Sequence, residues 1–192
     1  MAARKNNIIA LPNSRLRQGS KKVGVINTTI RKLAGDMQAA TLDWEKDRAH
    51  EVGVALAAVQ IDKLLRIVVI RNNPDDKKDR SFSVFINPEI TKYEGTVSTD
   101  FEGCLSIPDV YGKVPRYSKV RVKALDLEGK ILRMTAEGFL SRVFQHEIDH
   151  IKGKLFIDHI RKKPSAFFKL LPSGELEKLD YAKDVRDNRI LW

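Results

Sequence analysis

The first periodic pattern in the chain is helical. Within residues 28–47, apolar side chains recur at three- and four-residue steps and predict one amphipathic helix. The positions that carry this pattern are Ile30, Leu33, Met37, Ala40, Leu42 and Trp44. A short run that is rich in β-branched residues, Leu65–Ile70, then predicts a buried strand.

Three further segments show the signals of strands. The sequence SVFINPEI, residues 83–90, predicts a strand that ends at Asn87-Pro88. Residues 114–125 alternate between apolar and polar side chains before the turn-prone sequence DLEG. Residues 130–135 follow this turn, and we expect them to pair back as a hairpin.

The period changes again after these strands. Thr135 is a plausible N-cap and Gly153 a plausible end for a helix that is apolar on more than one face. Such a helix packs on several sides, so we predict an α+β fold in which strands wrap a central helix. The apolar positions of this helix are Phe139, Leu140, Val143, Phe144, Ile148 and Ile151.

The length of the chain and the positions of its linker-like segments favour one domain. The chain has 192 residues, and the strong linker candidates are residues 72–80 and the segment after Lys163. We therefore predict a single catalytic domain over 1–163, followed by a C-terminal tail over 164–192 for which a helix is one possibility. With Cys104 as the single cysteine, the chain forms no internal disulfide.

Charge changes the list of expected partners. The formal net charge is +10 at pH 7, which favours contact with polyanions such as the ribosome, while a solvated basic surface is the alternative. No sequence-specific nucleic-acid motif is present. No apolar run is long enough to span a bilayer, and the basic start lacks the features of a secretory signal. We therefore expect a bacterial-type cytoplasmic protein, with an organellar matrix as the alternative.

Candidate chemistry lies on the predicted central helix. His146, Glu147 and His150 form the pattern H-E-x-x-H. Residues four apart share a helix face, so both imidazoles can hold one metal ion while the carboxylate stands beside the open coordination position. A coincidental pattern on a surface helix is the alternative.

A catalytic metal usually has three protein ligands, so a third is needed. Cys104 is the natural choice because it lies in the loop-like segment EGCLSIP, residues 102–108. A small buried hydrophobic role is the usual alternative for a lone cysteine. Asp158 and His159 are competing ligands that spacing alone does not exclude.

Three ordered motifs resemble one family. GVALAAVQ (53–60), EGCLS (102–106) and QHEIDH (145–150) are similar to the three motifs of peptide deformylases. LPNSRLR near the start and VPR at 114–116 are also similar, so the resemblance covers about residues 9–160. It implies antiparallel sheets around a central helix that carries the two histidines.

The resemblance also implies an activity. It identifies the chain as a metal-dependent hydrolase that removes the N-formyl group from the initiator formylmethionine of nascent polypeptides and releases formate. One divalent ion is expected, Fe²⁺ in the cell, with Zn²⁺, Ni²⁺ or Co²⁺ able to occupy the same site. The implied roles are metal ligand for Cys104, His146 and His150, general acid/base for Glu147, and stabilisation of the tetrahedral intermediate for Gln60 and the backbone amide of Leu105.

The resemblance further implies a substrate-binding site. For the apolar residues Val54, Phe139 and Val143, plain core packing is the alternative role. For Arg116, the alternative is a solvated position on the surface. The chain departs from the family pattern at two positions, with Ala55 where glycine is usual and Val59 where proline or asparagine is usual. The Ala55 methyl is expected to narrow the cleft or to conflict with a glycine-only backbone. The expected substrate-binding residues are Val54, Ala55, Gly103, Arg116, Phe139 and Val143.

Two other functions remain as alternatives. A zinc endopeptidase also uses H-E-x-x-H, although no HExxHxxGxxH extension follows here. A ribosome-associated module with a structural metal and impaired catalysis is the third reading. Asp149, next to His150, is expected to orient a ligand or to anchor a cation.

Overall fold

The protein is described by a computed structural model that covers residues 3–186. Its first long element is helix α1, Thr28–Trp44, which confirms the predicted helix and is followed by the 3-10 turn η3, Glu45–Asp47. The Asn27 side chain caps this helix by accepting a hydrogen bond from the Ile30 amide. The apolar face of α1 is buried, as its spacing predicts, through Ile30, Leu33, Met37, Ala40 and Trp44.

One antiparallel sheet organises the rest of the fold. Its strand order is β1-β2-β3-β4-β6-β7, and β5 also pairs with β4. The second strand confirms the predicted buried run, and the hairpin of β4 and β5 confirms the pairing expected around DLEG. The strands are β1 Ala55–Ala57, β2 Ile67–Arg71, β3 Phe82–Cys104, β4 Ile107–Leu125, β5 Ile131–Glu137, β6 Phe167–Leu170 and β7 Leu176–Lys178.

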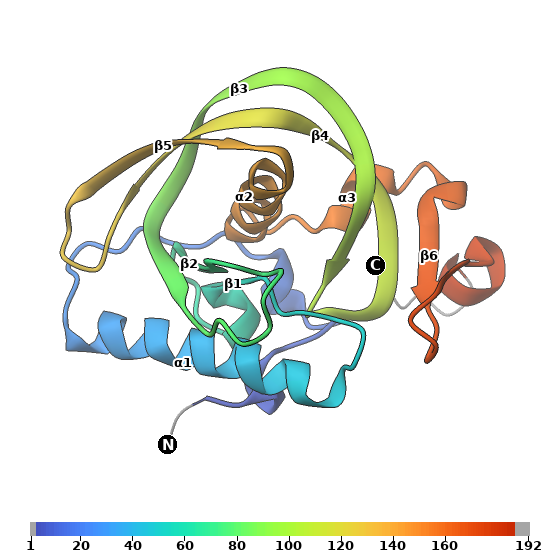
Figure 1. The fold of residues 1–192 in the computed structure, drawn as a ribbon, viewed down its shortest axis with the longest axis horizontal. Coiled ribbons are helices and arrows are strands. Elements are labelled where there is room, and N and C mark those ends of the chain that lie inside the picture. The colour runs from blue at the N-terminus through green and yellow to red at the C-terminus, as the bar shows by residue number, and fades with distance from the viewer. Residues whose placement is uncertain (1–2, 187–192) are drawn as a thin grey trace.

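The two longest strands exceed their predicted lengths. The prediction that a strand ends at Asn87-Pro88 is wrong, because β3 continues through this site to Cys104. Asn87 has a φ of 53°, and the pairing of β3 with β4 shifts register between Ile86 and Glu89. Such bulges leave a residue unpaired and bend the strand, so proline is accommodated and the strand can curve. Figure 1 shows β3 and β4 as an arch that curves around α2.

Helix α2, Gly138–Ile151, lies within that arch and contacts β1, β3, β4 and β5. The proposed N-cap Thr135 is wrong, since it belongs to β5 and the N-cap is Glu137. Gly153, with a φ of 73°, follows the helix end as expected. The α+β fold class with antiparallel strands is confirmed, with one continuous sheet over the described residues instead of separate sheets.

The segment after residue 163 differs from the expected tail. It forms a hairpin, β6 and β7, that extends the sheet along β4. Among the residues described there, the helical parts are the 3-10 turn η5, Pro164–Ala166, and the π-helix η6, Tyr181–Arg186. The reason lies in two adjacent aromatic residues, Phe167 and Phe168, which are both buried. Residues 187–192 of the expected tail lie outside the described part of the chain.

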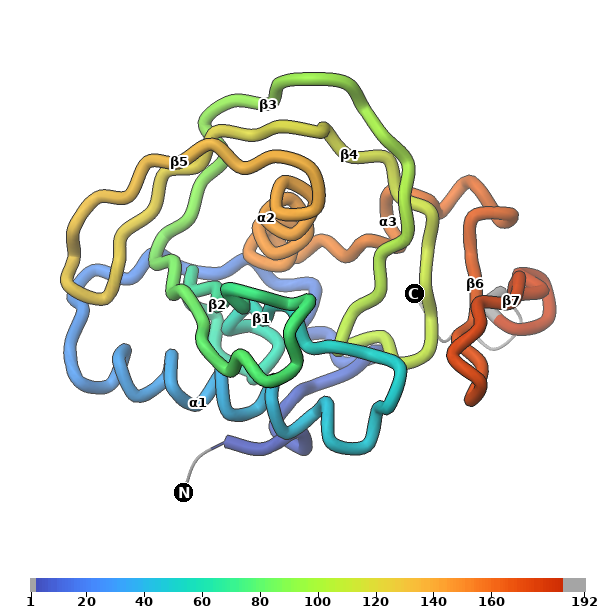
Figure 2. Tube along the Cα trace, in the orientation of Figure 1, coloured from blue at the N-terminus to red at the C-terminus, as the bar shows by residue number. Residues whose placement is uncertain are grey.

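The remaining helical elements are short. Figure 2 shows the N-terminal segment passing beneath the sheet before α1. Within residues 3–186, no helix is long and apolar enough to cross a membrane. These short elements are η1 Lys5–Asn7, η2 Ser14–Arg17, η4 Ala58–Ile61, α3 Phe156–Ile160 and η5 Pro164–Ala166.

Candidate active site

The structure brings together one sulfur and two imidazoles that are far apart in the sequence. Ligand atoms of Cys104, His146 and His150 all lie within 4.8 Å of one another, and the three side chains are largely buried. The Cys104 Sγ is 3.3 Å from the His150 Nε2. Donors that bind one ion at about 2.0 to 2.3 Å lie about 3 to 4 Å apart, so this spacing suits a single metal ion.

Local structure explains the convergence. Cys104 is the last residue of β3, and a tight turn at Leu105 and Ser106 leads directly into β4. The segment that was expected to be loop-like is therefore the end of a β-hairpin. His146 and His150 stand one turn apart on α2, which lies within the arch of β3 and β4.

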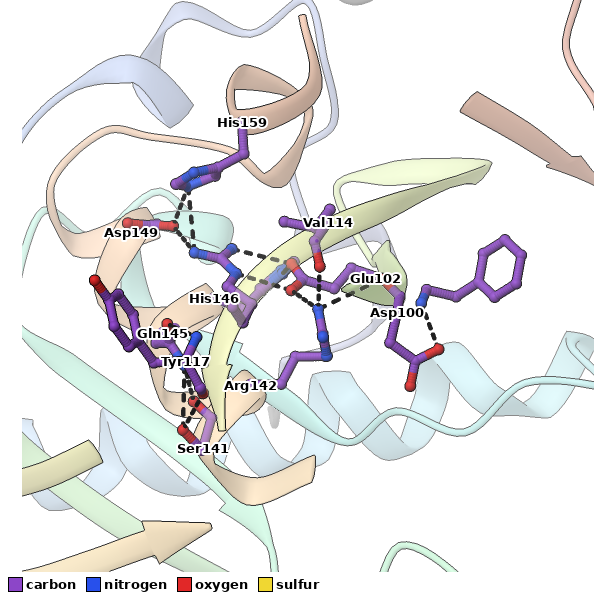
Figure 3. A network of polar contacts seen from close by, with 12 residues as sticks. Asp100, Glu102, Val114, Tyr117, Ser141, Arg142, Gln145, His146, Asp149 and His159 are labelled. Atoms are coloured by element: carbon purple, nitrogen blue, oxygen red, sulfur yellow. Dashed lines mark hydrogen bonds and ion pairs between the residues drawn. The ribbon is translucent and has the colours of Figure 1, made fainter. Parts of the chain in front are cut away.

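Glu102 fixes the orientation of one histidine. Its carboxylate accepts hydrogen bonds from the Nε and Nη2 of Arg116, from Arg142 Nη1, and from His146 Nδ1 at 3.0 Å. Figure 3 shows Glu102 at the centre of these contacts. Because Nδ1 is engaged by the carboxylate, Nε2 of His146 is left for the metal. Burial opposes ionisation of Glu102, but hydrogen bonds from His146 and Arg116 hold its pKa well below the usual range.

The sequence offered signals for these supporting residues, although they were not singled out. Glu102 precedes Cys104 by two residues on a strand, so both side chains point to the same face. Arg142 precedes His146 by four residues on α2 and therefore shares its face. The Arg142 guanidinium also donates to the backbone carbonyls of Val114 and Ser98, which ties α2 to the arch.

Arg116 does not reach the place expected for it. It is 5% exposed, and besides Glu102 it contacts Asp149 through Nη1 at 2.6 Å. His159 Nε2 lies 2.7 Å from the same Asp149 carboxylate, as Figure 3 shows. Arg116 is thus a buried cation held between two carboxylates, and it is not among the residues that line the cavity. Asp149 anchors it, in agreement with the expectation that Asp149 holds a cation.

The two competing ligands lie elsewhere. His159 belongs to the ion-pair network of Asp149, and the Asp158 carboxylate accepts hydrogen bonds from Arg17 and from the backbone amide of Leu155. Among the described residues, neither joins the cluster of potential metal ligands. The structure therefore favours Cys104 over both as the third donor.

Glu147 is buried beside the ligands without a polar partner for one of its oxygens. The residue is 4% exposed, and its Oε2 has no hydrogen-bond partner among the described residues. Burial raises the pKa of Glu147 to about 7, while the neighbouring His146 acts in the opposite direction. A carboxyl with a pKa near neutrality can both take up and release a proton at the pH of a cell.

Gln60 lies against the same centre. Its side-chain oxygen accepts from the Ala57 amide, and its Nε2 lies 3.1 Å from Ser106 Oγ and 3.5 Å from Cys104 Sγ. The side chain is 1% exposed, so its amide is held in one place by the 3-10 turn η4 and by Ser106. An amide donor therefore points toward the ligand cluster from the side of β1.

A cavity of about 210 Å³ opens onto these residues. Five of the six expected substrate-binding residues line it, and Arg116 does not. Phe139 is 57% exposed at its rim, whereas Val143 is buried. The lining also includes residues that were not predicted, namely Trp44, Glu51, Val52, Phe101, Tyr111 and Arg142, beside the predicted Val54, Ala55, Gly103, Phe139 and Val143.

The two departures from the family pattern are accommodated without strain. Ala55 lies in β1, paired with Ile70, and is not among the described residues with positive φ. A glycine-only backbone is therefore not required there. Val59 is fully buried in the core and does not line the cavity. Ala55, by contrast, is one of the residues that line the cavity.

The donor set fits a divalent ion. Burial holds the pKa of His150 well below its usual value, so this imidazole is neutral and can act as a ligand. Burial also disfavours a charge on His146, yet hydrogen bonds with Cys104 and Glu102 outweigh it and raise the His146 pKa. The surroundings of the sulfur thus favour a positive charge, which a metal ion would supply. Two nitrogens and one sulfur leave a tetrahedral ion one free position.

Comparisons with known proteins agree with this geometry. A peptide deformylase of Mesorhizobium japonicum is 47% identical over 155 residues, which are 81% of this chain and 84% of that protein. The crystal structure of a peptide deformylase from Legionella pneumophila superposes with a TM-score of 0.72 at 42% identity, over 82% of this chain and 86% of the other.

A second solved structure is a peptide deformylase from Synechococcus elongatus in complex with actinonin. It has a TM-score of 0.72 and 34% identity, over 79% of this chain and 78% of the other. The sequence profile of the polypeptide deformylase family matches residues 5–165. The chain therefore belongs to the polypeptide deformylase family.

Proposed function

We infer that this protein hydrolyses the formyl amide at the amino terminus of new polypeptides, with formate and a free amino group as products. The observation that carries this inference is the convergence of Cys104, His146 and His150 beside the buried carboxylate of Glu147. These three donors can hold a divalent ion, which would supply Lewis acidity, and the adjacent carboxyl can transfer the protons that hydrolysis of an unactivated amide involves. Membership of the polypeptide deformylase family agrees with this chemistry.

We propose Fe²⁺ as the ion held in the cell, with Zn²⁺, Ni²⁺ or Co²⁺ able to take its place. The supporting observation is the mixed set of sulfur and nitrogen donors, which suits several late first-row metals. A bound divalent ion supplies Lewis acidity, which makes water a stronger acid and polarises the formyl carbonyl. Glu102 acts through His146 by fixing which nitrogen faces the ion.

Glu147 is proposed as the proton shuttle. Its unpartnered Oε2 can accept a proton from the attacking water, and the carboxyl can return that proton to the nitrogen of the leaving amine. The C–N bond of the formyl amide breaks in this second step, and formate leaves with the carbonyl carbon. One group can serve both steps because burial raises its pKa to about 7.

Gln60 and the backbone amide of Leu105 are proposed as donors to the oxygen that gains negative charge as the formyl carbon becomes tetrahedral. Gln60 Nε2 lies next to Cys104 Sγ, and Leu105 follows Cys104 in the turn. Donors that are fixed before the reaction need no reorganisation, and the loss of one such donor costs about 2.7 to 4 kcal/mol of barrier.

We propose that the apolar part of the cavity accepts the methionine side chain. Val143 and Phe139 are four residues apart on α2, and Val54, which directly precedes β1, lines the same cavity. Ala55 and Gly103 bring backbone close to the cavity, where a peptide chain can lie. The small volume favours a formyl group, which has only hydrogen on its carbonyl carbon.

Contact with the ribosome through the basic surface is proposed from the net charge of +10. We place this activity in the bacterial-type cytoplasm, with an organellar matrix as the alternative, because its substrates are nascent chains. Co-sedimentation with ribosomes that weakens steeply with added salt would support the contact. Absence of co-sedimentation at low salt would contradict it.

Formate release from formyl-Met-Ala-Ser by protein prepared without oxygen and loaded with iron tests the proposed function. We expect turnover by the wild type, and a loss of about 10²- to 10⁴-fold in kcat for Glu147→Gln with the metal content unchanged. Unchanged formate release in Glu147→Gln would contradict the role of Glu147. Cleavage of internal, unformylated peptide bonds that survives Cys104→Ser would indicate an endopeptidase instead.

A further inference from the structure

The C-terminal hairpin of β6 and β7 lies outside the part of the chain that the family profile matches, which ends at residue 165. Strand β6 nevertheless pairs with the stretch of β4 that borders the cavity. Phe168 is the register partner of Tyr111, and Tyr111 is a cavity-lining residue. Figure 2 shows β6 running beside β4 on the side away from β3. The hairpin therefore packs behind one wall of the cavity and supports it.

A second contact joins the hairpin to the same wall. The Phe168 ring meets the ring of Phe101 edge to face, with centroids 4.9 Å apart and planes at 81°. Phe101 lines the cavity. The Lys113 Nζ lies 5.0 Å from the centre of the Phe101 ring and 5.5 Å from that of Phe168, so the cation covers both rings. The Phe168 ring thus packs against Phe101, and the backbone of β6 pairs with that of β4 at Tyr111, so β6 supports two cavity-lining aromatic residues.

The hairpin is firmly anchored behind this contact. Phe167 is fully buried in the core cluster that also contains Cys104 and Phe156. Its ring meets Tyr181 at a centroid distance of 5.1 Å, which brings the segment after β7 back onto β6. An element anchored in this way can hold its neighbours in a fixed position, because packed side chains have little room to move.

We propose that the β6–β7 hairpin is a substrate-binding element of this protein and that Phe168 is a positioning residue. Its ring holds Phe101, and the pairing of β6 with β4 holds Tyr111, where both contact the part of the formylated peptide that lies away from the formyl group. The inference rests on the proposed function. Phe168 stands behind the wall and does not touch the reacting atoms, so it contributes to binding of substrate and transition state alike. Such uniform binding appears in KM and leaves kcat unchanged.

Steady-state kinetics of iron-loaded Phe168→Ala with formyl-Met-Ala-Ser test this proposal. We expect KM to rise about three- to tenfold, the size of a lost aromatic pair, with kcat within about twofold and the metal content unchanged. Phe168→Leu keeps apolar bulk but has no ring edge for Phe101. We expect its KM to rise by at least about twofold and to remain below that of Phe168→Ala.

Tyr93→Ala is the matched control. Tyr93 and Tyr117 form another aromatic pair between β3 and β4, with centroids 5.2 Å apart, and neither lines the cavity. This variant should keep the wild-type KM. An unchanged KM in Phe168→Ala, or an equal rise in Tyr93→Ala, would overturn the proposal. If Phe168→Ala does not fold, an unchanged KM in Phe168→Leu overturns it. Absence of formate release by the wild type would instead contradict the proposed function.

Discussion

At the ligand end of the cavity, the buried carboxylate of Glu102 accepts charged hydrogen bonds from three largely buried side chains, those of Arg116, Arg142 and His146. At the hairpin end, the wall is held by ring packing and by the pairing of β6 with β4. Removing one member of a buried charged network leaves the other charges without a partner. Removing one ring from an aromatic wall costs only its own contacts.

This difference in bonding determines how much change in sequence each end of the cavity tolerates. The ligand end must keep its atoms fixed relative to one ion, and its network of mutually dependent charges tolerates little change. The hairpin end only shapes the space for a peptide, and a graded set of dispersion contacts can be altered residue by residue. It is consistent with this difference that the ligand end lies within residues 5–165, which match the family, and the hairpin does not.

The largest effect is expected where the charged network is broken. Glu102→Ala removes the carboxylate that pairs with the buried Arg142 and one of the two that pair with Arg116, and it releases His146 Nδ1. We expect the free energy of unfolding to fall by about 3 to 5 kcal/mol and metal affinity to fall about 10- to 100-fold. Denaturant unfolding and metal titration measure the two changes. A variant with wild-type metal affinity would contradict the orienting role of Glu102.

Removal of the metal tests the ligand end without a mutation. An ion that binds only the folded protein stabilises it by about 2.7 kcal/mol when its free concentration is 100 times Kd. We therefore expect a chelator to lower the thermal midpoint and to abolish formate release, with both restored by added ion. The hairpin variant Phe168→Ala should show the same metal-dependent shift as the wild type. A smaller shift in this variant would mean that the two ends are coupled.

Arg116→Lys is expected to have the next largest effect. The guanidinium donates to both oxygens of Glu102 and to Asp149, and a lysine ammonium cannot match this planar geometry. We expect a loss of about 2 kcal/mol in the free energy of unfolding. KM for formyl-Met-Ala-Ser should stay at the wild-type value, because Arg116 does not line the cavity. A raised KM with an unchanged free energy of unfolding would indicate that Arg116 takes part in substrate binding.

The sequence predicts the ligand helix well because its signals are local. His146 and His150 are four residues apart, so their shared face follows from helix geometry alone. The helix 28–47 and the hairpin around DLEG are equally local, and the structure confirms both. The position of Cys104 could not be predicted from local signals alone. Its approach to α2 depends on the whole fold, which only the order of the three motifs indicated.

Other features depend on pairings that the sequence does not display. Residues 91–100 of β3 are mostly exposed and lack apolar alternation, so the strand beyond Pro88 could not be predicted. An arginine is normally a surface residue, and Arg116 is buried here because Glu102 on the neighbouring strand and Asp149 on α2 both accept hydrogen bonds from its guanidinium. The short aromatic run that begins at Phe167 could not be predicted as a strand, because the strand that it pairs with, β4, is distant in the sequence.

The smallest effect is expected at the hairpin end, where Tyr111→Phe removes a single hydroxyl. The Tyr111 hydroxyl donates to Glu51 Oε1 at 2.7 Å, which joins the loop before β1 to β4 across the cavity wall. Arg48 still donates to the other oxygen of Glu51, so the carboxylate keeps a partner.

We expect Tyr111→Phe to lower the free energy of unfolding by about 1 kcal/mol and to raise KM by no more than about fivefold, with metal affinity unchanged. Denaturant unfolding, steady-state kinetics and metal titration measure these quantities. Ser83→Ala, which removes an exposed hydroxyl that donates to Asn72, is the control and should leave KM unchanged. A loss of metal affinity in Tyr111→Phe would show that the two ends of the cavity do not respond independently.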